Sequence, residues 1–456
     1  MERALLPTYA KSFGDRKFLM IMLALVFTLI VDISVVKVYD LVSKFFIPIQ
    51  YKLTLFSVNT SICTFLQFLL IWYIKGSFDQ DSLNTNKIKV RVFYIASVCS
   101  IVIASALLGG LIYQLLSGEY YDKRLSISLI GLSYATSTGF IVSLSVLFLS
   151  WFRSNHSIIV FLYFVSMLGI AFNLIMTGAF MGVSLGDRPT MIGQYVGATG
   201  DISAGRHDAL DYTYRISTFV SFFGIWLTTT ILVNYYRERT INSIVYWTIL
   251  CIPLAYFLIT YFYRFIFSDI LITYLQIDPV AVSIALSAFL SSSKPLGGLI
   301  FGLVFWKISR TIRYERNVRT YMVISGWGLF LIFAANQAAL QTVAPYPPFG
   351  VGTITALNIA GFFMLIGIYN SAILVSSNNE LRKSIHRHAM ESKLLGMIGQ
   401  AEMEMEIQKT VKRIAQDKNL FEKDLEQPVE LDENELKKYL DFVAREVKKS
   451  KQVTDS

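Results

Sequence analysis

Ten long apolar stretches alternate with short polar and basic segments along the chain. A helix crosses a bilayer with about 20 apolar residues at a rise of 1.5 Å each. Strands of such length would leave open sheet edges, which lipid does not tolerate because backbone polar groups would lack partners. The pattern therefore predicts an all-α fold, a polytopic transmembrane helix bundle of about ten spans. The expected spans are 18–36, 53–74, 92–116, 126–151, 158–185, 216–236, 243–267, 279–306, 321–340 and 351–375.

The composition agrees with this class. The 456 residues are 54% hydrophobic and 16% charged, whereas soluble domains carry roughly 25% charged residues. The three cysteines, Cys63, Cys99 and Cys251, all fall inside expected spans. Their spacing fits neither a disulfide framework nor a zinc site, so we interpret them as apolar packing residues.

Basic residues predict the orientation of the bundle. With the N-terminus in the cytoplasm, the loops on that side hold about twice as many Lys and Arg residues as the outer loops, as the positive-inside rule requires. Trp72, Trp151 and Trp306 each lie just before a basic residue at a cytoplasmic boundary, the level at which aromatic rings collect. We therefore expect a cell-membrane protein with both termini cytoplasmic, a transmembrane domain over 1–375 and a cytoplasmic helical tail over 376–456.

The formal net charge of +9 bears on the partners of the chain. The excess positive charge lies in the membrane half, because the tail is nearly balanced. Anionic headgroups of the inner leaflet are therefore the expected partner, together with membrane lipid in general. Nucleic acid is not expected.

The outer segment 186–215 is rich in Gly and Asp and is longer than most connections. Loops of this length are usually functional or disordered. His207, Asp208 and Asp211 are the metal-ligand types within it, but three such residues without a second cluster are weak evidence for a hard-metal site. We expect no metal and no cofactor.

Several polar residues share one predicted depth, within about 10 Å of the outer ends of their spans. They are Asp32, Asn59, Asn336, Gln337 and Asn358. Polar groups inside spans are candidates for function, and a common level predicts an outward-facing polar pocket for a small polar or cationic ligand. The alternative is interhelical hydrogen bonding that only holds the helices together.

The expected span 279–306 contains a second unusual feature, Lys294 followed by Pro295. Proline removes a hydrogen-bond donor and predicts a kink, and a charged residue inside a span either extends toward the interface or pairs with an acid. The two residues are candidates for a kink or gate. An inert bend explains them equally well.

The tail contains two amphipathic segments. Apolar residues over 390–414 follow coiled-coil spacing, beginning with Leu394, Ile398 and Ala401. Two heptads do not distinguish a coiled coil from packing on the membrane surface. A second helix is expected over 432–449, after a capping box. Such faces need a partner, so we expect a protein partner or self-association through 381–449.

No catalytic template is found. The chain has no phosphate-binding loop, no metalloprotease motif, no nucleophile elbow and no dinucleotide fingerprint, so we do not expect an enzyme. The first hypothesis is a non-enzymatic sensor or adaptor that couples the polar pocket to the tail. The alternative is a secondary transporter of a small polar or cationic solute that uses the kinked span 279–306.

Overall fold

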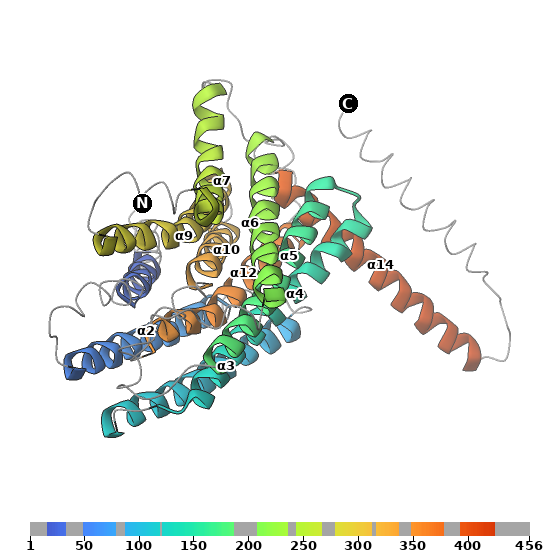
Figure 1. Cartoon of the computed structure of the whole chain (residues 1–456). Helices are drawn as coiled ribbons and strands as arrows, with labels where there is room; N and C mark the ends of the chain where they lie inside the picture. Colours follow the sequence, from blue (N-terminus) through green and yellow to red (C-terminus); the bar gives the residue numbers. More distant parts are fainter. Residues whose placement is uncertain are drawn as a thin grey trace, which may run out of the picture. The chain divides into compact units, whose positions relative to one another are not determined.

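The computed structural model describes ten ranges of the chain (Figure 1). They are 16–32, 49–78, 87–118, 121–186, 208–235, 243–266, 279–311, 316–336, 348–377 and 393–424. All the regular secondary structure within these ranges is helical. The sequence-based expectation of a helical fold is confirmed for this part of the chain.

A helix over residues 16–32 comes first. The helices that follow are α2 (Ile49–Phe78), α3 (Lys87–Gly118), α4 (Lys123–Ser154), α5 (Ile158–Gly186), α6 (Asp208–Tyr235), α7 (Ser243–Ile266), α9 (Pro279–Thr311), α10 (Arg316–Ala335), α12 (Val351–Ser377) and α14 (Lys393–Asp424).

Within the described ranges, seven helices are long and apolar enough to cross a membrane, judged by length and composition. They are the apolar parts of α2, α3, α4, α5, α6, α10 and α12. These seven support a membrane location, while the count of ten spans stays a prediction.

Two helices have bounds that differ from those of the expected spans, and the span boundaries themselves stay predictions. α6 begins at Asp208, well before the expected residue 216, because its first turns are polar and are held by an ion pair between Asp211 and Arg215 at 2.7 Å. The helix thus includes residues 208–215 of the expected outer segment 186–215. α10 ends at Ala335, whereas the expected span runs to residue 340, and residues 337–340 lie outside the described part of the chain.

α12 lies at the centre of the bundle. It packs against α2, α3, α4 and α10, and every residue from Val351 to Ala372 is buried. A helix that is apolar all round is buried in this way, whereas a surface helix shows one apolar stripe. The remaining pairs include α4 with α5, α5 with α6, and α9 with both α7 and α10.

Glycines allow α9, α10 and α12 to approach closely. A Cβ atom on Gly328 of α10 would lie 2.5 Å from the backbone nitrogen of Met364 in α12. A Cβ atom on Gly302 of α9 would lie 2.6 Å from the carbonyl oxygen of Gly326 in α10. Small residues at such crossings are how membrane helices gain van der Waals contact without help from the hydrophobic effect.

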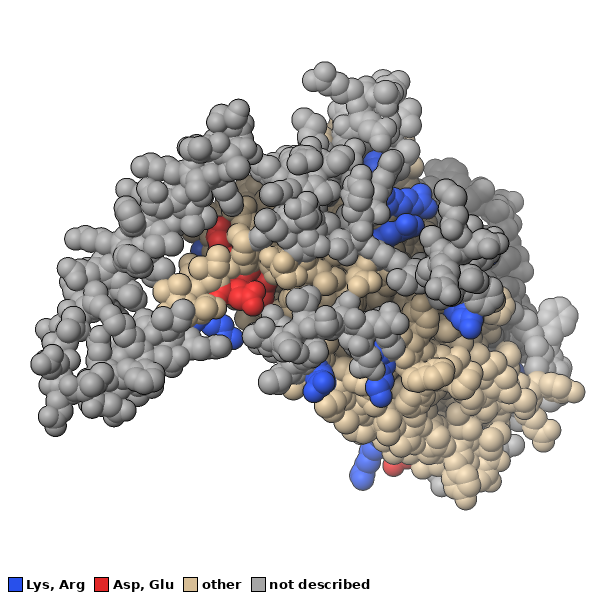
Figure 2. All heavy atoms as spheres, turned by 180° about the vertical axis from the view of Figure 1, so that it is seen from behind, with Lys and Arg blue, Asp and Glu red and all other residues tan. Residues whose placement is uncertain are grey.

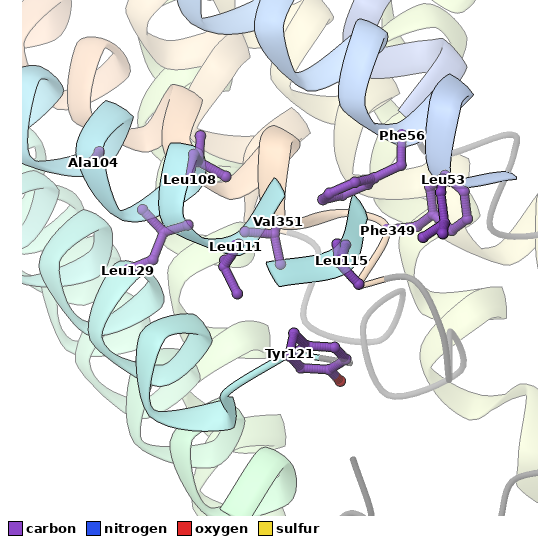
Figure 3. Close-up of a cluster of buried hydrophobic side chains, with 10 residues drawn as sticks. All are labelled: Leu53, Phe56, Ala104, Leu108, Leu111, Leu115, Tyr121, Leu129, Phe349 and Val351. Carbon is purple, nitrogen blue, oxygen red and sulfur yellow. The ribbon is translucent and has the colours of Figure 1, made fainter. Parts of the chain in front are cut away.

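An apolar cluster holds the beginning of α12 in place (Figure 3). Phe349 and Val351 pack there among side chains of α2, α3 and α4, and Phe349 meets Phe56 edge to face at 5.5 Å between ring centroids. We call this end of the bundle, where α12 begins, the far end. The opposite end, where α4 and α12 end and α5 begins, is called the tail end.

The outward-facing surface of the bundle is apolar. The more exposed large apolar side chains include Met20, Phe27, Phe65, Trp72 and Tyr113. On the face drawn in Figure 2, uncharged side chains form most of the described surface and charged ones are scattered. Lipid is the environment that such a surface requires.

The chain divides into two compact units, Met1–Glu402 and Met403–Ser456. Residues 393–402 of α14 therefore belong to the same unit as the bundle, although the sequence assigned them to the tail. α14 continues to Asp424, beyond the expected end at residue 414. Gln337 and the expected helix 432–449 lie outside the described residues.

Candidate functional site

Asp32 forms the N-terminal cap of α12, although it belongs to the helix over 16–32. Its Oδ1 atom accepts a hydrogen bond from the backbone N–H of Gly350 at 3.2 Å. Its Oδ2 atom accepts from the backbone N–H of Thr353 at 2.9 Å and from the Thr353 hydroxyl at 2.7 Å. Asp32 is only 2% exposed, so these three contacts occur inside the protein.

The local sequence explains why α12 needs this distant cap. The first N–H groups of any helix lack partners in the helix, and a Ser, Thr, Asp or Asn just before the helix usually accepts from them. Gly350 occupies that place with a φ of 86° and has no side-chain acceptor. The Asp32 carboxylate takes over the role, and the dipole of α12 favours its negative charge.

Asn59 and Gln67 extend this polar region along α2. The Asn59 amide donates to the carbonyl oxygen of Thr28 at 3.2 Å. The Gln67 amide donates to the Thr355 hydroxyl of α12 at 2.9 Å. These contacts tie the first helix and α12 to α2.

Asn358 joins α12 to two other helices. Its Oδ1 atom accepts a hydrogen bond from the Ser100 hydroxyl of α3 at 3.1 Å, and its amide donates to the Ser133 hydroxyl of α4 at 3.4 Å. Asn358 is fully buried. It therefore links α3, α4 and α12 at one level.

Asn336 belongs to a third group, centred on Asn173 of α5. The Asn336 amide donates to the Asn173 Oδ1 atom at 2.7 Å, and its own Oδ1 atom accepts from the Tyr134 hydroxyl at 3.1 Å. The Asn173 amide donates to the hydroxyls of Ser217 at 3.1 Å and Thr218 at 2.9 Å. These side chains join α4, α5 and α6 to the residue that follows α10.

The expected pocket residues that the structure describes, Asp32, Asn59, Asn336 and Asn358, thus lie in three hydrogen-bonded groups toward the far end. Within the described part of the chain, no hydrogen bond connects Asp32 with Asn336 or Asn358. Hydrogen bonds between membrane helices contribute modestly, often about 0.6 kcal/mol each. The arrangement agrees with the simpler interpretation, helix-to-helix bonding, and a ligand pocket at these residues stays a prediction.

Lys294 and Pro295 lie in α9, which runs through the proline as one helix. The Lys294 ammonium lies 3.4 Å from the Tyr214 hydroxyl of α6 and 5.5 Å from the centroid of its ring. The expected kink or gate at these residues remains untested. The position of Lys294 does show that its side chain meets another helix.

The tail end of the bundle holds the beginning of α14. The Trp151 indole of α4 donates to Oε2 of Glu402 at 2.7 Å, and both residues are buried. Gly399 lies so close to Val375 of α12 that a Cβ atom would overlap that side chain. We call these contacts the α14 seat.

The apolar face expected for a coiled coil is used in this seat. Leu394, Ile398 and Ala401 are each at most 2% exposed within the unit that contains the bundle. Over these residues the structure gives no support for a coiled coil, because the face is already covered by the chain itself.

Sequence reasoning missed two important residues. Asn173 carries an amide in the middle of a 29-residue apolar helix, about 20 Å from its outer end, so the depth argument that selected Asn336 did not select it, although any polar group inside a span is a candidate for function. Glu402 had no such signal, because a charged residue in a polar tail is usually solvated.

Comparison of the chain with protein-family models, with curated proteins and with solved structures finds no match.

Proposed function

We propose that this protein is a non-enzymatic membrane sensor or adaptor that couples the polar far end of the bundle to the helical tail. The α14 seat is the observation that carries the proposal. A buried hydrogen bond from Trp151 to Glu402 at 2.7 Å joins a transmembrane helix directly to the tail helix. A tail that served only as a tether would need no such bond.

α12 supplies the physical link between the two ends. Its first turn is capped by Asp32, and Val375 in its last turns contacts Gly399 of α14. The 27 residues of α12 span about 40 Å. A shift of α12 caused at the far end would therefore reach α14, and a packed helix with two arrangements is the kind of element that couples distant sites.

In this proposal, the part of the tail that follows Glu402 passes the signal to a partner. Within the second unit, Glu406, Ile407 and Lys409 of α14 are exposed, and Ile407 is 53% exposed. We propose that a cytoplasmic protein or a second copy of the chain binds through 381–449. Anionic headgroups are the proposed lipid partner at the cytoplasmic boundary.

Hydrogen exchange tests the coupling without knowledge of the signal. Asp32→Ala removes the cap of α12 at the far end, and we expect faster amide exchange at 394–402 as well as near Thr353. Ser166→Ala is the matched control, since it removes a buried bond between α5 and α6, to Thr228 at 2.7 Å, without contacting α12. Unchanged exchange at 394–402 in Asp32→Ala would contradict the proposal.

Deletion of the tail distinguishes a sensor or adaptor from a secondary transporter. A chain that lacks residues 403–456 keeps the whole bundle unit. Reconstituted into vesicles, it should show no saturable flux of small polar or cationic solutes. Flux that persists after this deletion would favour the transporter instead.

A further inference from the structure

Lys294 brings a positive charge to the interior of the bundle. Its neighbours on α9 show which way this part of the helix faces. Ser293 is within hydrogen-bond distance of Thr260 in α7 at 3.2 Å, and Gly297 lies against the ring of Phe222 in α6. The Lys294 side chain itself reaches Tyr214 of α6 and is partly buried.

No carboxylate balances this charge among the described residues. Asp211, one turn before Tyr214, is already paired with Arg215 at 2.7 Å. Asp32 is engaged by α12. A Lys at the centre of a membrane-spanning helix costs about 2.5–3.5 kcal/mol on the insertion scale. Contact with a neutral hydroxyl and a ring face offsets only part of that cost.

Lys294 and Tyr214 together have more hydrogen-bond donors than they have acceptors nearby. An ammonium group has three N–H donors and no acceptor, and only one donor of Lys294 is used, on the Tyr214 oxygen. The Tyr214 hydroxyl accepts that bond, and its own proton has no acceptor within the described part of the chain. Three donors and one positive charge therefore converge at one place without an acceptor.

The site is also held in shape. The Tyr214 ring stacks on Phe180 of α5, with centroids 4.8 Å apart and planes 9° apart. The Tyr214 carbonyl oxygen accepts a hydrogen bond from the Ser217 hydroxyl at 2.8 Å, and Ser217 in turn accepts from the Asn173 amide at 3.1 Å, which places the pair beside the Asn173 and Asn336 group. A rigid ring carrying a free O–H donor is preorganised for a ligand.

We propose that Lys294 and Tyr214 form a binding site for an oxyanion, a carboxylate or phosphate group. An anion supplies the missing charge and accepts the free donors, with charge-assisted hydrogen bonds of the stronger kind. The site would repel the cationic solute considered from the sequence. It does not depend on the α14 seat, so this proposal and the sensor proposal can fail separately.

Binding is measured by the thermal stability of the purified full chain, with two sources of oxyanion tested separately. In neutral phosphatidylcholine nanodiscs, acetate and inorganic phosphate are titrated against matched chloride. In the second arm, nanodiscs containing phosphatidylglycerol replace the soluble anions. A ligand that binds only the folded state raises the melting temperature saturably.

We expect the stabilisation in at least one arm for the wild type, and its loss in Lys294→Met. Tyr214→Phe should weaken binding about tenfold or more, because a hydrogen bond to a charged group is lost. Arg124→Met is the control, since it removes an exposed positive charge that lies away from the expected cytoplasmic boundary and should leave the effect intact.

A response confined to soluble anions identifies a free solute, and one confined to phosphatidylglycerol identifies a lipid headgroup. Both outcomes support the site. No saturable response in either arm, or an equal response in Lys294→Met, overturns it.

Discussion

Replacement of Asp32 tests whether its carboxylate holds the first turn of α12. In Asp32→Ala the backbone N–H groups of Gly350 and Thr353 lose their acceptor, and so does the Thr353 hydroxyl. The hydroxyl can rotate toward a carbonyl oxygen of its own helix. The two backbone donors cannot, and each buried donor left unpaired costs about 1–3 kcal/mol.

Asp32→Asn is the comparison that isolates these hydrogen bonds. Both variants remove the buried charge, so any relief from its desolvation cancels between them. The asparagine oxygen can accept from both Thr353 donors, whereas alanine accepts from neither. We therefore expect Asp32→Ala to be less stable than Asp32→Asn by about 1–3 kcal/mol, the cost of one backbone donor.

The assay is reversible unfolding in mixed detergent and SDS micelles, followed by helicity and tryptophan fluorescence. Thr60 lies beside Gly352 at the same place, and its hydroxyl has no partner in the described part of the chain. Thr60→Val is therefore combined with both Asp32 variants, so that this hydroxyl cannot replace the lost acceptor. Equal unfolding midpoints for the two double variants would refute the capping role.

Three further changes are expected to have defined effects. Gly350→Ala should destabilise the fold by about 1–2 kcal/mol in the same assay, because its φ of 86° lies in the left-handed region that disfavours a Cβ atom; an unchanged midpoint would contradict that backbone geometry. Gly328→Val should prevent α10 from reaching Met364, with a loss of about 1–3 kcal/mol or more; a fully folded, equally stable variant would show that the two helices lie further apart. Trp151→Phe should increase protease cleavage within 394–402 several-fold by removing the donor to Glu402, and cleavage equal to wild type would argue against the seat.

The sequence predicted the apolar helices well because length and hydropathy decide them. The span expected over 158–185 is α5, Ile158–Gly186, and the one over 351–375 is α12, Val351–Ser377. Within lipid, a helix is one of the few structures that give every backbone N–H and C=O group a hydrogen-bond partner. The polar ends were less predictable, because Asp211 and Arg215 extend α6 with an ion pair that hydropathy does not register.

The hydrogen-bond partners of the polar residues could not be predicted from the sequence. Depth along a span places a residue at a level, but it does not say which neighbouring helix the residue faces. Asp32 and Asn358 share a predicted level, yet Asp32 faces the first turn of α12 and Asn358 faces α3 and α4. The rotation of each helix depends on packing, here on contacts such as Gly361 against Ser137.

The tail illustrates the same difficulty. The residues at the start of its apolar face, Leu394 and Ile398, are buried by the chain itself, whereas the expected protein partner or self-association through 381–449 stays a prediction. The spacing did not identify the partner as the bundle itself. Coiled-coil spacing and the spacing of any helix packed on a surface are the same over two turns, so only the three-dimensional neighbours distinguish them.

The coupling proposed for α12 depends on how little this helix can deform. It contains no proline, unlike α7 and α9, and proline is among the commonest causes of sharp kinks. Gly328 and Gly367 bring its backbone against α10, where a Cβ on Gly367 would lie 2.6 Å from the Tyr321 carbonyl oxygen. Under the proposed coupling, a displacement at Asp32 would then pass along α12 and α10 and would not be absorbed by bending. The seat at Val375 and Gly399 must then follow, so a bulky residue at Gly367 should weaken the coupling without touching either end.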